Sequence, residues 1–184
     1  ELPAARAERY REQLGVQEGA ALLLSVETEW AHFFDEVLEY GDSIEPRIAA
    51  NWLTGEFAAE LRRQDDQQLA ESKVSPGDLG SLVAMVSAKR ISHGSAKKVL
   101  ESMVADGADP AEVVEQQGLE QISDSGELEK IVEAAIEANP GPAEQVRSGN
   151  MKAIGALVGA VMKQTRGRAD GGEVNRLLKK SLGI

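Results

Sequence analysis

The residues best suited to binding a ligand are three cations near the end of the chain, Lys163, Arg166 and Arg168, which surround Gly167. The planar guanidinium of arginine can donate two parallel hydrogen bonds to one phosphate, so this composition suits a clamp on phosphate groups. Backbone amides at the helix start expected at Asp170 could add donors, although Asp170 itself occupies that position. Cations at the end of a helix also complement its dipole. The segment therefore predicts either a phosphate-binding loop or a charged helix end.

The charge distribution favours a partner with phosphates. The whole chain has a net charge of −11, yet residues 146–184 carry eight basic side chains and only two acidic ones. An acidic body with a basic end is typical of a terminus that faces nucleic acid, and Arg147 and Lys152 extend the basic region. Residues 119–184 contain no aromatic side chain. Because base reading uses aromatic stacking platforms, we expect recognition of shape and backbone instead.

Residues for catalysis or metal binding are scarce. There is no cysteine, and the only histidines are His32 and His93, so a zinc site or a histidine-based relay lacks its components. We expect His32, which lies among aromatic residues, to pack between helices, and His93, at an expected helix start, to be solvated. Asp65 and Asp66 are most simply part of a solvated acidic surface. We predict neither a catalytic residue nor a metal ligand in this chain.

Two glycines could be taken for a ligand-binding signal. Gly155 and Gly159 lie four residues apart on an apolar segment, and we expect them to allow close packing of helices. No Walker-type phosphate-binding sequence is present, because Gly167-Arg168 lacks the preceding glycine spacing and a strand before it.

The elements that would position these residues are helices. Ser75-Pro76-Gly77-Asp78 places an N-cap, a proline at the first helical position and an acid in the first turn ahead of an apolar helical pattern. Aromatic residues make up only 4% of the chain, which favours an aliphatic helical core over a β-sandwich. We find no strand-like alternation and predict an all-α fold. Helices are expected over 3–15, 26–38, 46–61, 75–86, 92–106, 109–118, 124–138, 151–162 and 170–182, with a helix end plus a linker over 62–73 and a firm stop at 139–142.

No segment predicts a membrane span or a signal peptide. The longest apolar run, Ala20–Leu24, is far shorter than the roughly 20 residues that a span requires. The lack of cysteine fits a cytoplasmic protein. Because the chain opens with Glu1 rather than methionine, we expect it to be part of a longer protein.

Four stretches resemble one family. The run from Gly149 to Leu182, GNMKAIGALVGAVMKQTRGRADGGEVNRLLKKSL, resembles the tail of the B subunit of the Asp/Glu-tRNA amidotransferases and the small YqeY proteins that share this tail. ELPAARAERY (Glu1–Tyr10) resembles the junction after the catalytic cradle domain of that subunit. ANWLTGEF (Ala50–Phe57) resembles its linking helical domain, and QISDSGELEKIVEAAIEANP (Gln121–Pro140) resembles the approach to its tail. The resemblance covers nearly the whole chain in order.

The resemblance implies a multi-helix linking domain over 1–118, a small YqeY-like tail domain over 119–184, and the absence of the cradle domain. In this family Glu-tRNA(Gln) or Asp-tRNA(Asn) is converted to the amidated form for translation by an ATP-dependent carbon–nitrogen ligase with glutamine as amido donor. ATP, magnesium and the ammonia channel belong to the cradle, so we expect no cofactor and no catalysis in this chain. The helical and tail domains are implied to grip the outer corner of tRNA on its D-loop side. The glutaminase (A) and small (C) subunits are expected to bind mainly through the missing cradle.

One stretch departs from the family pattern. The family has an Ile-Ser-Gly-Lys type of helix start where this chain has 91–95, ISHGS, so the expected lysine is absent. Lys97 and Lys98 lie one turn further on and are candidates to replace it. The predicted tRNA-binding residues are therefore Lys163, Arg166, Arg168, Lys152, Arg147, Lys97 and Lys98.

Two other functions remain open. The acidic helical body could dock other proteins, with the tail only completing the fold, or the chain could be a free-standing YqeY-like protein. The 118 residues upstream of the tail disfavour the second alternative. Salt-sensitive binding of tRNA distinguishes the first alternative from a tRNA-binding role.

Overall fold

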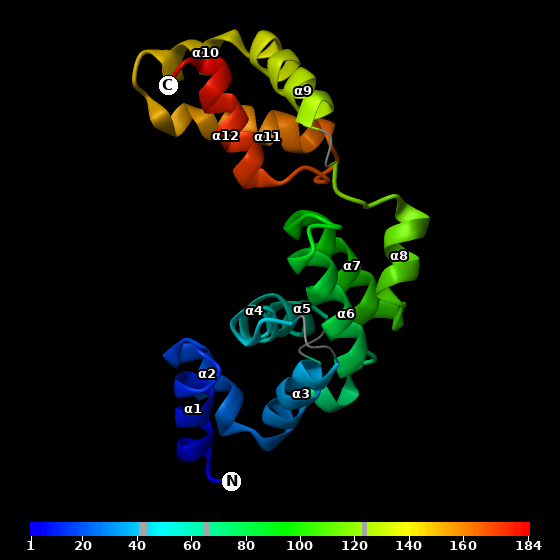
Figure 1. The fold of residues 1–184 in the computed structure, drawn as a ribbon. Helices are drawn as coiled ribbons and strands as arrows, with labels where there is room; N and C mark the ends of the chain where they lie inside the picture. Colours follow the sequence, from blue (N-terminus) through cyan, green and yellow to red (C-terminus); the bar gives the residue numbers. More distant parts are fainter. Residues whose placement is uncertain (41–43, 65–66, 123–124) are drawn as a thin grey trace. The chain divides into compact units, whose positions relative to one another are not determined.

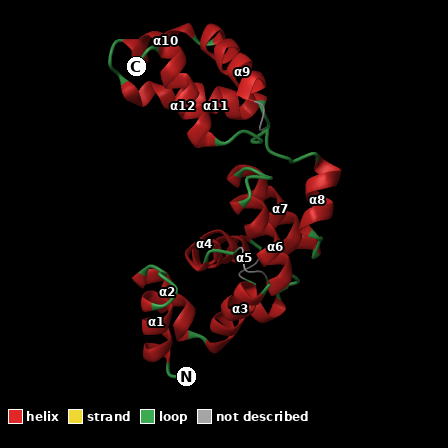
Figure 2. Cartoon of the chain, viewed as in Figure 1, coloured by secondary structure: helices red, strands yellow, loops and turns green. Residues whose placement is uncertain are grey.

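The computed structural model describes residues 1–40, 44–64, 67–122 and 125–184. Within these ranges the backbone is helical or irregular, and the one β-type pairing is an isolated bridge between Ile91 and Glu120 (Figures 1 and 2). The all-α prediction is confirmed.

Backbone contacts divide the chain into two compact units. The first comprises Glu1–Lys89 and Ala96–Gly118, and the second comprises Arg90–Ser95 and Leu119–Ile184. One boundary falls after Gly118, where the sequence predicts the change of domain. The inclusion of Arg90–Ser95 in the second unit has no counterpart in the sequence prediction. That the two units are separate domains stays a prediction.

The first unit is a set of short helices, several of which begin at the predicted caps. The Oγ of Ser75 accepts a hydrogen bond from the Asp78 amide at 3.1 Å, while the Asp78 carboxylate accepts one from the Ser75 amide at 3.2 Å. At the predicted start of the helix over 109–118, the Asp109 carboxylate accepts a hydrogen bond from the Glu112 amide at 2.9 Å. Asp124, where the sequence predicts a helix to begin, lies outside the described residues. The helical elements of this part of the chain are α1 (Pro3–Glu12), α2 (Glu18–Val26), α3 (Thr28–Glu39), α4 (Pro46–Asn51), the π-helical η1 (Trp52–Phe57), α5 (Ala58–Arg63), the 3-10 turn η2 (Leu69–Glu71), α6 (Pro76–Ser87), α7 (His93–Asp106, whose first residues are grouped with the second unit) and α8 (Pro110–Gln117).

Aromatic residues concentrate in the core of the first unit. The ring of Tyr10 meets that of Phe34 edge-on at a centroid distance of 4.9 Å, and its hydroxyl donates to the Ala31 carbonyl at 3.3 Å. Burial raises the pKa of Tyr10. Phe33 stacks on Phe57 at 5.6 Å. The neighbouring His32 is exposed, so the prediction that it packs between helices is wrong: on α3 it lies on the face opposite the buried residues.

Two helices were not predicted. Helix α2 contains the run Ala20–Leu24, which is continuously apolar and therefore shows no helical period. Helix α10 (Pro140–Arg147) begins where the sequence predicts only a stop. Proline at the first helical position needs no backbone hydrogen bond, so Pro140 both ends the preceding helix and starts the next one.

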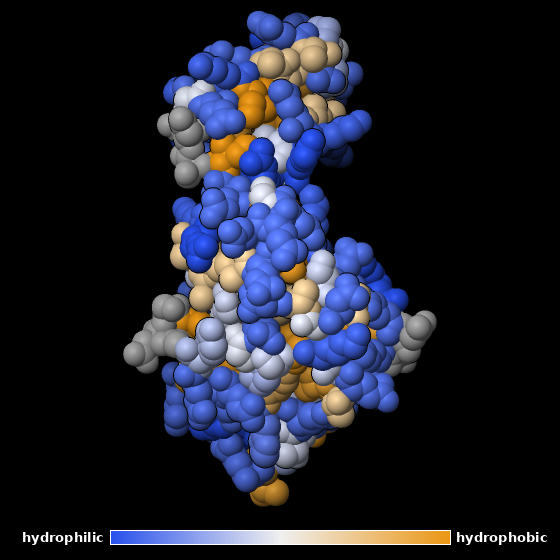
Figure 3. All heavy atoms as spheres, turned by 90° about the vertical axis from the view of Figure 1, so that its right-hand side faces the viewer, coloured by the Kyte–Doolittle hydropathy of each residue, from blue (hydrophilic) through white to orange (hydrophobic). Residues whose placement is uncertain are grey.

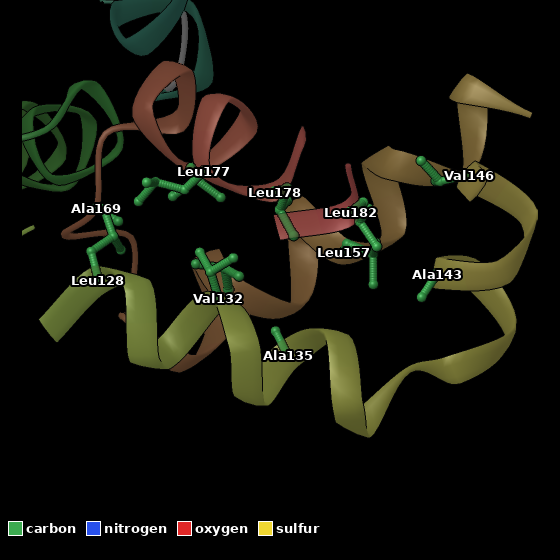
Figure 4. Packing of buried hydrophobic residues seen from close by; sticks show 12 residues of the cluster. Leu128, Val132, Ala135, Ala143, Val146, Leu157, Ala169, Leu177, Leu178 and Leu182 are labelled. Carbon is green, nitrogen blue, oxygen red and sulfur yellow. The ribbon is translucent and has the colours of Figure 1, made fainter. Parts of the chain in front are cut away.

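The second unit has an aliphatic core built by the remaining helices. Leu128, Val132 and Ala135 on α9 (Ser125–Ala138) point towards Leu177 and Leu178 (Figure 4). The latter two lie on α12 (Gly171–Leu182), and α11 (Ile154–Gln164) adds further buried side chains; η3 (Met151–Ala153) is a 3-10 turn before α11. The buried cluster comprises Leu128, Val132, Ala135, Ala143, Val146, Leu157, Val161, Ala169, Val174, Leu177, Leu178 and Leu182.

Hydrophilic side chains cover most of the face shown in Figure 3, with hydrophobic atoms visible between them in patches. Among the described helices, none is long and apolar enough to cross a membrane.

Candidate functional site

The predicted basic loop forms the C-terminal end of α11. The Gly167 amide donates to the Met162 carbonyl at 2.8 Å, and the Arg166 amide donates to the Lys163 carbonyl at 3.2 Å. This pair of hydrogen bonds is the Schellman arrangement, in which the residue after the helix cap adopts a left-handed conformation. Arg166 is that residue, with φ of 56°, and Gly167 follows with φ of 80°. The cations therefore lie on a defined turn.

The conformation of Arg166 bears on the choice between a structural and a binding role. A left-handed conformation costs a residue with a Cβ about 1–2 kcal/mol, and glycine is the usual occupant of this position. Terminating the helix would therefore be easier with glycine than with arginine. Because Arg166 is also exposed, the need to end α11 does not explain the presence of a guanidinium here.

The backbone of this turn is held from several sides. Thr165 is only 1% exposed, and its hydroxyl donates to the Val161 carbonyl at 3.0 Å. The Arg168 amide donates to the Thr165 carbonyl at 3.1 Å, and the Arg168 carbonyl accepts from the Ile122 amide at 3.2 Å. The hydroxyl of Ser92 donates to the Gly167 carbonyl. The turn thus presents exposed Lys163 and Arg166 and half-buried Arg168 from a fixed frame.

The helix start that follows the loop is already capped by an acidic side chain. The carboxylate of Asp170 accepts from the Glu173 amide at 2.8 Å and so caps α12. A carboxylate in this position repels an anion. Phosphate binding at this loop would therefore depend on the basic side chains.

The other predicted cations do not join this cluster. The guanidinium Nη1 of Arg147 lies 3.9 Å from the carboxylate Oε2 of Glu144 on α10, and Lys152 is exposed on η3. Since α11 separates η3 from the loop and rises 1.5 Å per residue, Lys152 and the loop lie roughly 16 Å apart along the helix.

The predicted substitutes for the missing family lysine belong to helix α7 and to the first unit. The Lys97 ammonium lies 2.9 Å from the Glu56 carboxylate. Lys97 and Lys98 line a cavity of about 160 Å³ together with Glu56, Glu60 and Glu101. Arg63 lines the same cavity and pairs with Glu60 and Glu101, so Glu56 offsets the charge of Lys97, a contact that the sequence alone does not show.

No other predicted feature forms a site. Among the described residues, no group of three or more metal-ligating side chains occurs. His93 is exposed at the start of α7. Gly155 and Gly159 are exposed, and a Cβ on either would meet nothing within 4 Å, so the prediction of close helix packing is wrong. Asp65 and Asp66 lie outside the described residues.

The structure places one further arginine beside the loop that sequence reasoning missed. Arg90 is exposed, and its carbonyl accepts from the Gln121 amide at 2.7 Å. The next residue, Ile122, donates to the carbonyl of Arg168. The available signal is the basic pair Lys89-Arg90, two residues before the predicted helix start at Ser92.

Comparison with known proteins finds one matching family and several similar proteins that share one name. The GatB domain family matches residues 32–182. The chain is 40% identical over 183 residues to the aspartyl/glutamyl-tRNA(Asn/Gln) amidotransferase B subunit of Solidesulfovibrio magneticus, covering 100% of this chain and 38% of the relative. It is 41% identical over 186 residues to the protein of the same name in Ralstonia pickettii, with 100% and 38% coverage. The corresponding protein of Shouchella clausii is 38% identical over 182 residues, with 99% and 38% coverage. The chain thus spans well under half the length of these relatives.

Proposed function

Because the chain belongs to the GatB domain family, we propose that it is the tRNA-binding region of an amidotransferase B subunit, which holds the charged tRNA while another domain carries out the chemistry. The proposed substrates of the whole enzyme are Glu-tRNA(Gln) and Asp-tRNA(Asn), which it amidates for translation in the cytoplasm. The single observation that supports a binding role most strongly is the loop 163–168. It presents three cations on a turn whose backbone is hydrogen-bonded on both sides.

In this proposal, the remainder of the full-length protein binds ATP and magnesium and transfers ammonia. The glutaminase and the small third subunit would likewise bind mainly there. The part proposed for this chain is to position substrate, which lowers the entropic barrier of the reaction without supplying a reacting group. The outer corner of tRNA fits this role, because the loop offers phosphate donors and residues 119–184 contain no aromatic side chain on which a base could stack.

Replacing Arg166 by glycine tests this function against the structural alternative. Glycine adopts the left-handed conformation readily, so the end of α11 should persist and the free energy of unfolding should stay the same or rise by up to about 1 kcal/mol. Removing one phosphate contact should reduce the slope of log affinity for tRNA against log salt concentration by about 0.7–0.9. Urea unfolding and a salt series of tRNA titrations measure the two quantities.

Lys179→Gln is the matched control, because it removes one charge from an exposed position on the last turn of α12 in the same unit. An Arg166→Gly protein that unfolds more easily but binds tRNA with an unchanged salt slope would show that Arg166 serves the fold.

An exposed apolar surface favours a second, compatible function in protein docking. Leu22, Leu23 and Val26 of α2 are 51%, 64% and 70% exposed. Contiguous exposed apolar side chains mark interaction sites in many proteins. If docking were the main function, Leu22→Ser combined with Leu23→Ser would abolish assembly with the other subunits, and tRNA affinity would be insensitive to salt.

A further inference from the structure

Segment 120–122 joins two arginine-bearing stretches that are far apart in the sequence. The Gln121 amide donates to the Arg90 carbonyl at 2.7 Å, and the Ile122 amide donates to the Arg168 carbonyl at 3.2 Å. These two hydrogen bonds hold the backbones of Arg90 and Arg168 against neighbouring residues of one short segment. This places an exposed arginine next to the loop on a backbone frame shared with it.

Ser92 adds a second link between the same stretches. Its side chain is buried, and its Oγ accepts a hydrogen bond from the Ser95 amide at 3.0 Å, as a helix N-cap does. The hydroxyl proton is donated to the carbonyl of Gly167, which lies 75 residues later in the chain. One hydroxyl thus caps the start of α7 and holds the centre of the basic loop.

The link acts on the part of the loop that determines where the guanidinium groups point. Gly167 lies between Arg166 and Arg168, and both Arg166 and Gly167 have left-handed backbone conformations. A glycine has many accessible conformations, so an unrestrained peptide here would let the two arginines reorient independently. Fixing its carbonyl lowers the entropy that phosphate binding has to remove.

We propose that Arg90 forms one phosphate-binding surface with Arg166 and Arg168, and that Ser92 is a positioning residue that holds this surface in its binding conformation. This inference rests on the proposed tRNA-binding function. The ligand is the phosphate backbone of a folded tRNA, since the surface consists of guanidinium groups and residues 119–184 contain no aromatic side chain.

The test measures the binding of a tRNA(Gln) transcript to the 184-residue chain over a series of salt concentrations, for the wild type and four variants. Arg90→Ala should lower the salt slope by about 0.7–0.9, as expected for one lost phosphate contact. Ser92→Gly keeps most of the helix-capping effect but removes the hydroxyl, and it should weaken binding about five- to tenfold with faster hydrogen exchange at Gly167 and Arg168. Ser92→Thr retains a hydroxyl and should restore both affinity and exchange protection.

The matched control is Ser75→Gly, which removes the serine cap of α6 in the first unit without touching the loop. It should leave tRNA affinity unchanged. Wild-type binding that none of the Arg90 and Ser92 variants alters would overturn this inference and leave the proposed function standing. Absence of salt-dependent tRNA binding by the wild type would overturn both. Equal losses in Ser92→Gly and Ser75→Gly would show that Ser92 acts through general stability, and would overturn its positioning role.

Discussion

Joint replacement of Lys163, Arg166 and Arg168 by alanine is expected to weaken tRNA binding roughly ten- to hundredfold at moderate salt, because up to three neutralised phosphates are lost. The slope of log affinity against log salt should fall by roughly 2–3, at about 0.7–0.9 per contact. The loss should be similar for several tRNA species, since phosphate contacts position a complex without carrying sequence. Titrations of each tRNA at several salt concentrations measure both the affinity and its salt slope.

The fold should tolerate this triple replacement. Lys163 and Arg166 are exposed, Arg168 is half-buried, and exposed charges contribute at most about 1 kcal/mol each, so helix content and melting temperature should change little. Replacing Arg176, Lys179 and Lys180 by alanine provides the control, since it removes the same charge from α12. If the loop variant melts much earlier while its salt slope matches that of the wild type, the cations are structural caps and the tRNA surface lies elsewhere, with Lys97 and Lys98 the next candidates.

Replacing Leu157 by alanine is expected to destabilise the second unit by about 2–5 kcal/mol, the range for removing a fully buried leucine. Leu157 is 0% exposed in the middle of α11 and belongs to the aliphatic cluster of that unit. Because native stabilities are about 5–15 kcal/mol, this is a large fraction of the total. Urea unfolding followed by circular dichroism measures the loss.

The exposed Leu23→Ala, 64% exposed on α2, is the control and should change the unfolding free energy by no more than about 0.5 kcal/mol. If the two units fold separately, Leu157→Ala should split unfolding into two transitions. A cost below about 1 kcal/mol at Leu157 would contradict the packing described for the second unit.

The sequence predicts those helices whose caps and apolar period agree. Helix α6 is the clearest case, because the capping box at Ser75 and Asp78 precedes Leu79, Leu82 and Val83, all of which are buried. The sequence does not predict helix α2, because its apolar run has no period, or α10, because Pro140 indicates only a stop. Local signals therefore fail where one residue serves two helices or where a helix is apolar on more than one face.

The candidate site could be predicted only in part. The composition of the loop and its place after an apolar helix can be predicted from the sequence, because charged residues and glycine are local features. The left-handed conformation of Arg166, the hydrogen bond from Ser92 and the place of Arg90 depend on contacts between distant parts of the chain. The ion pair of Lys97 with Glu56, which lowers the value of Lys97 as a phosphate ligand, was hidden for the same reason.

The central claim is that this chain binds tRNA through phosphate contacts, and the most direct test is a titration of the 184-residue chain with a tRNA transcript between about 50 and 200 mM salt. We expect affinity to fall linearly on the log–log plot, with a slope of at least about 3 in magnitude from the three loop cations and Arg90. Similar curves should be obtained with transcripts of tRNA(Gln) and tRNA(Asn). Undetectable binding at the lowest salt, or an affinity that does not change over this range, would contradict the claim.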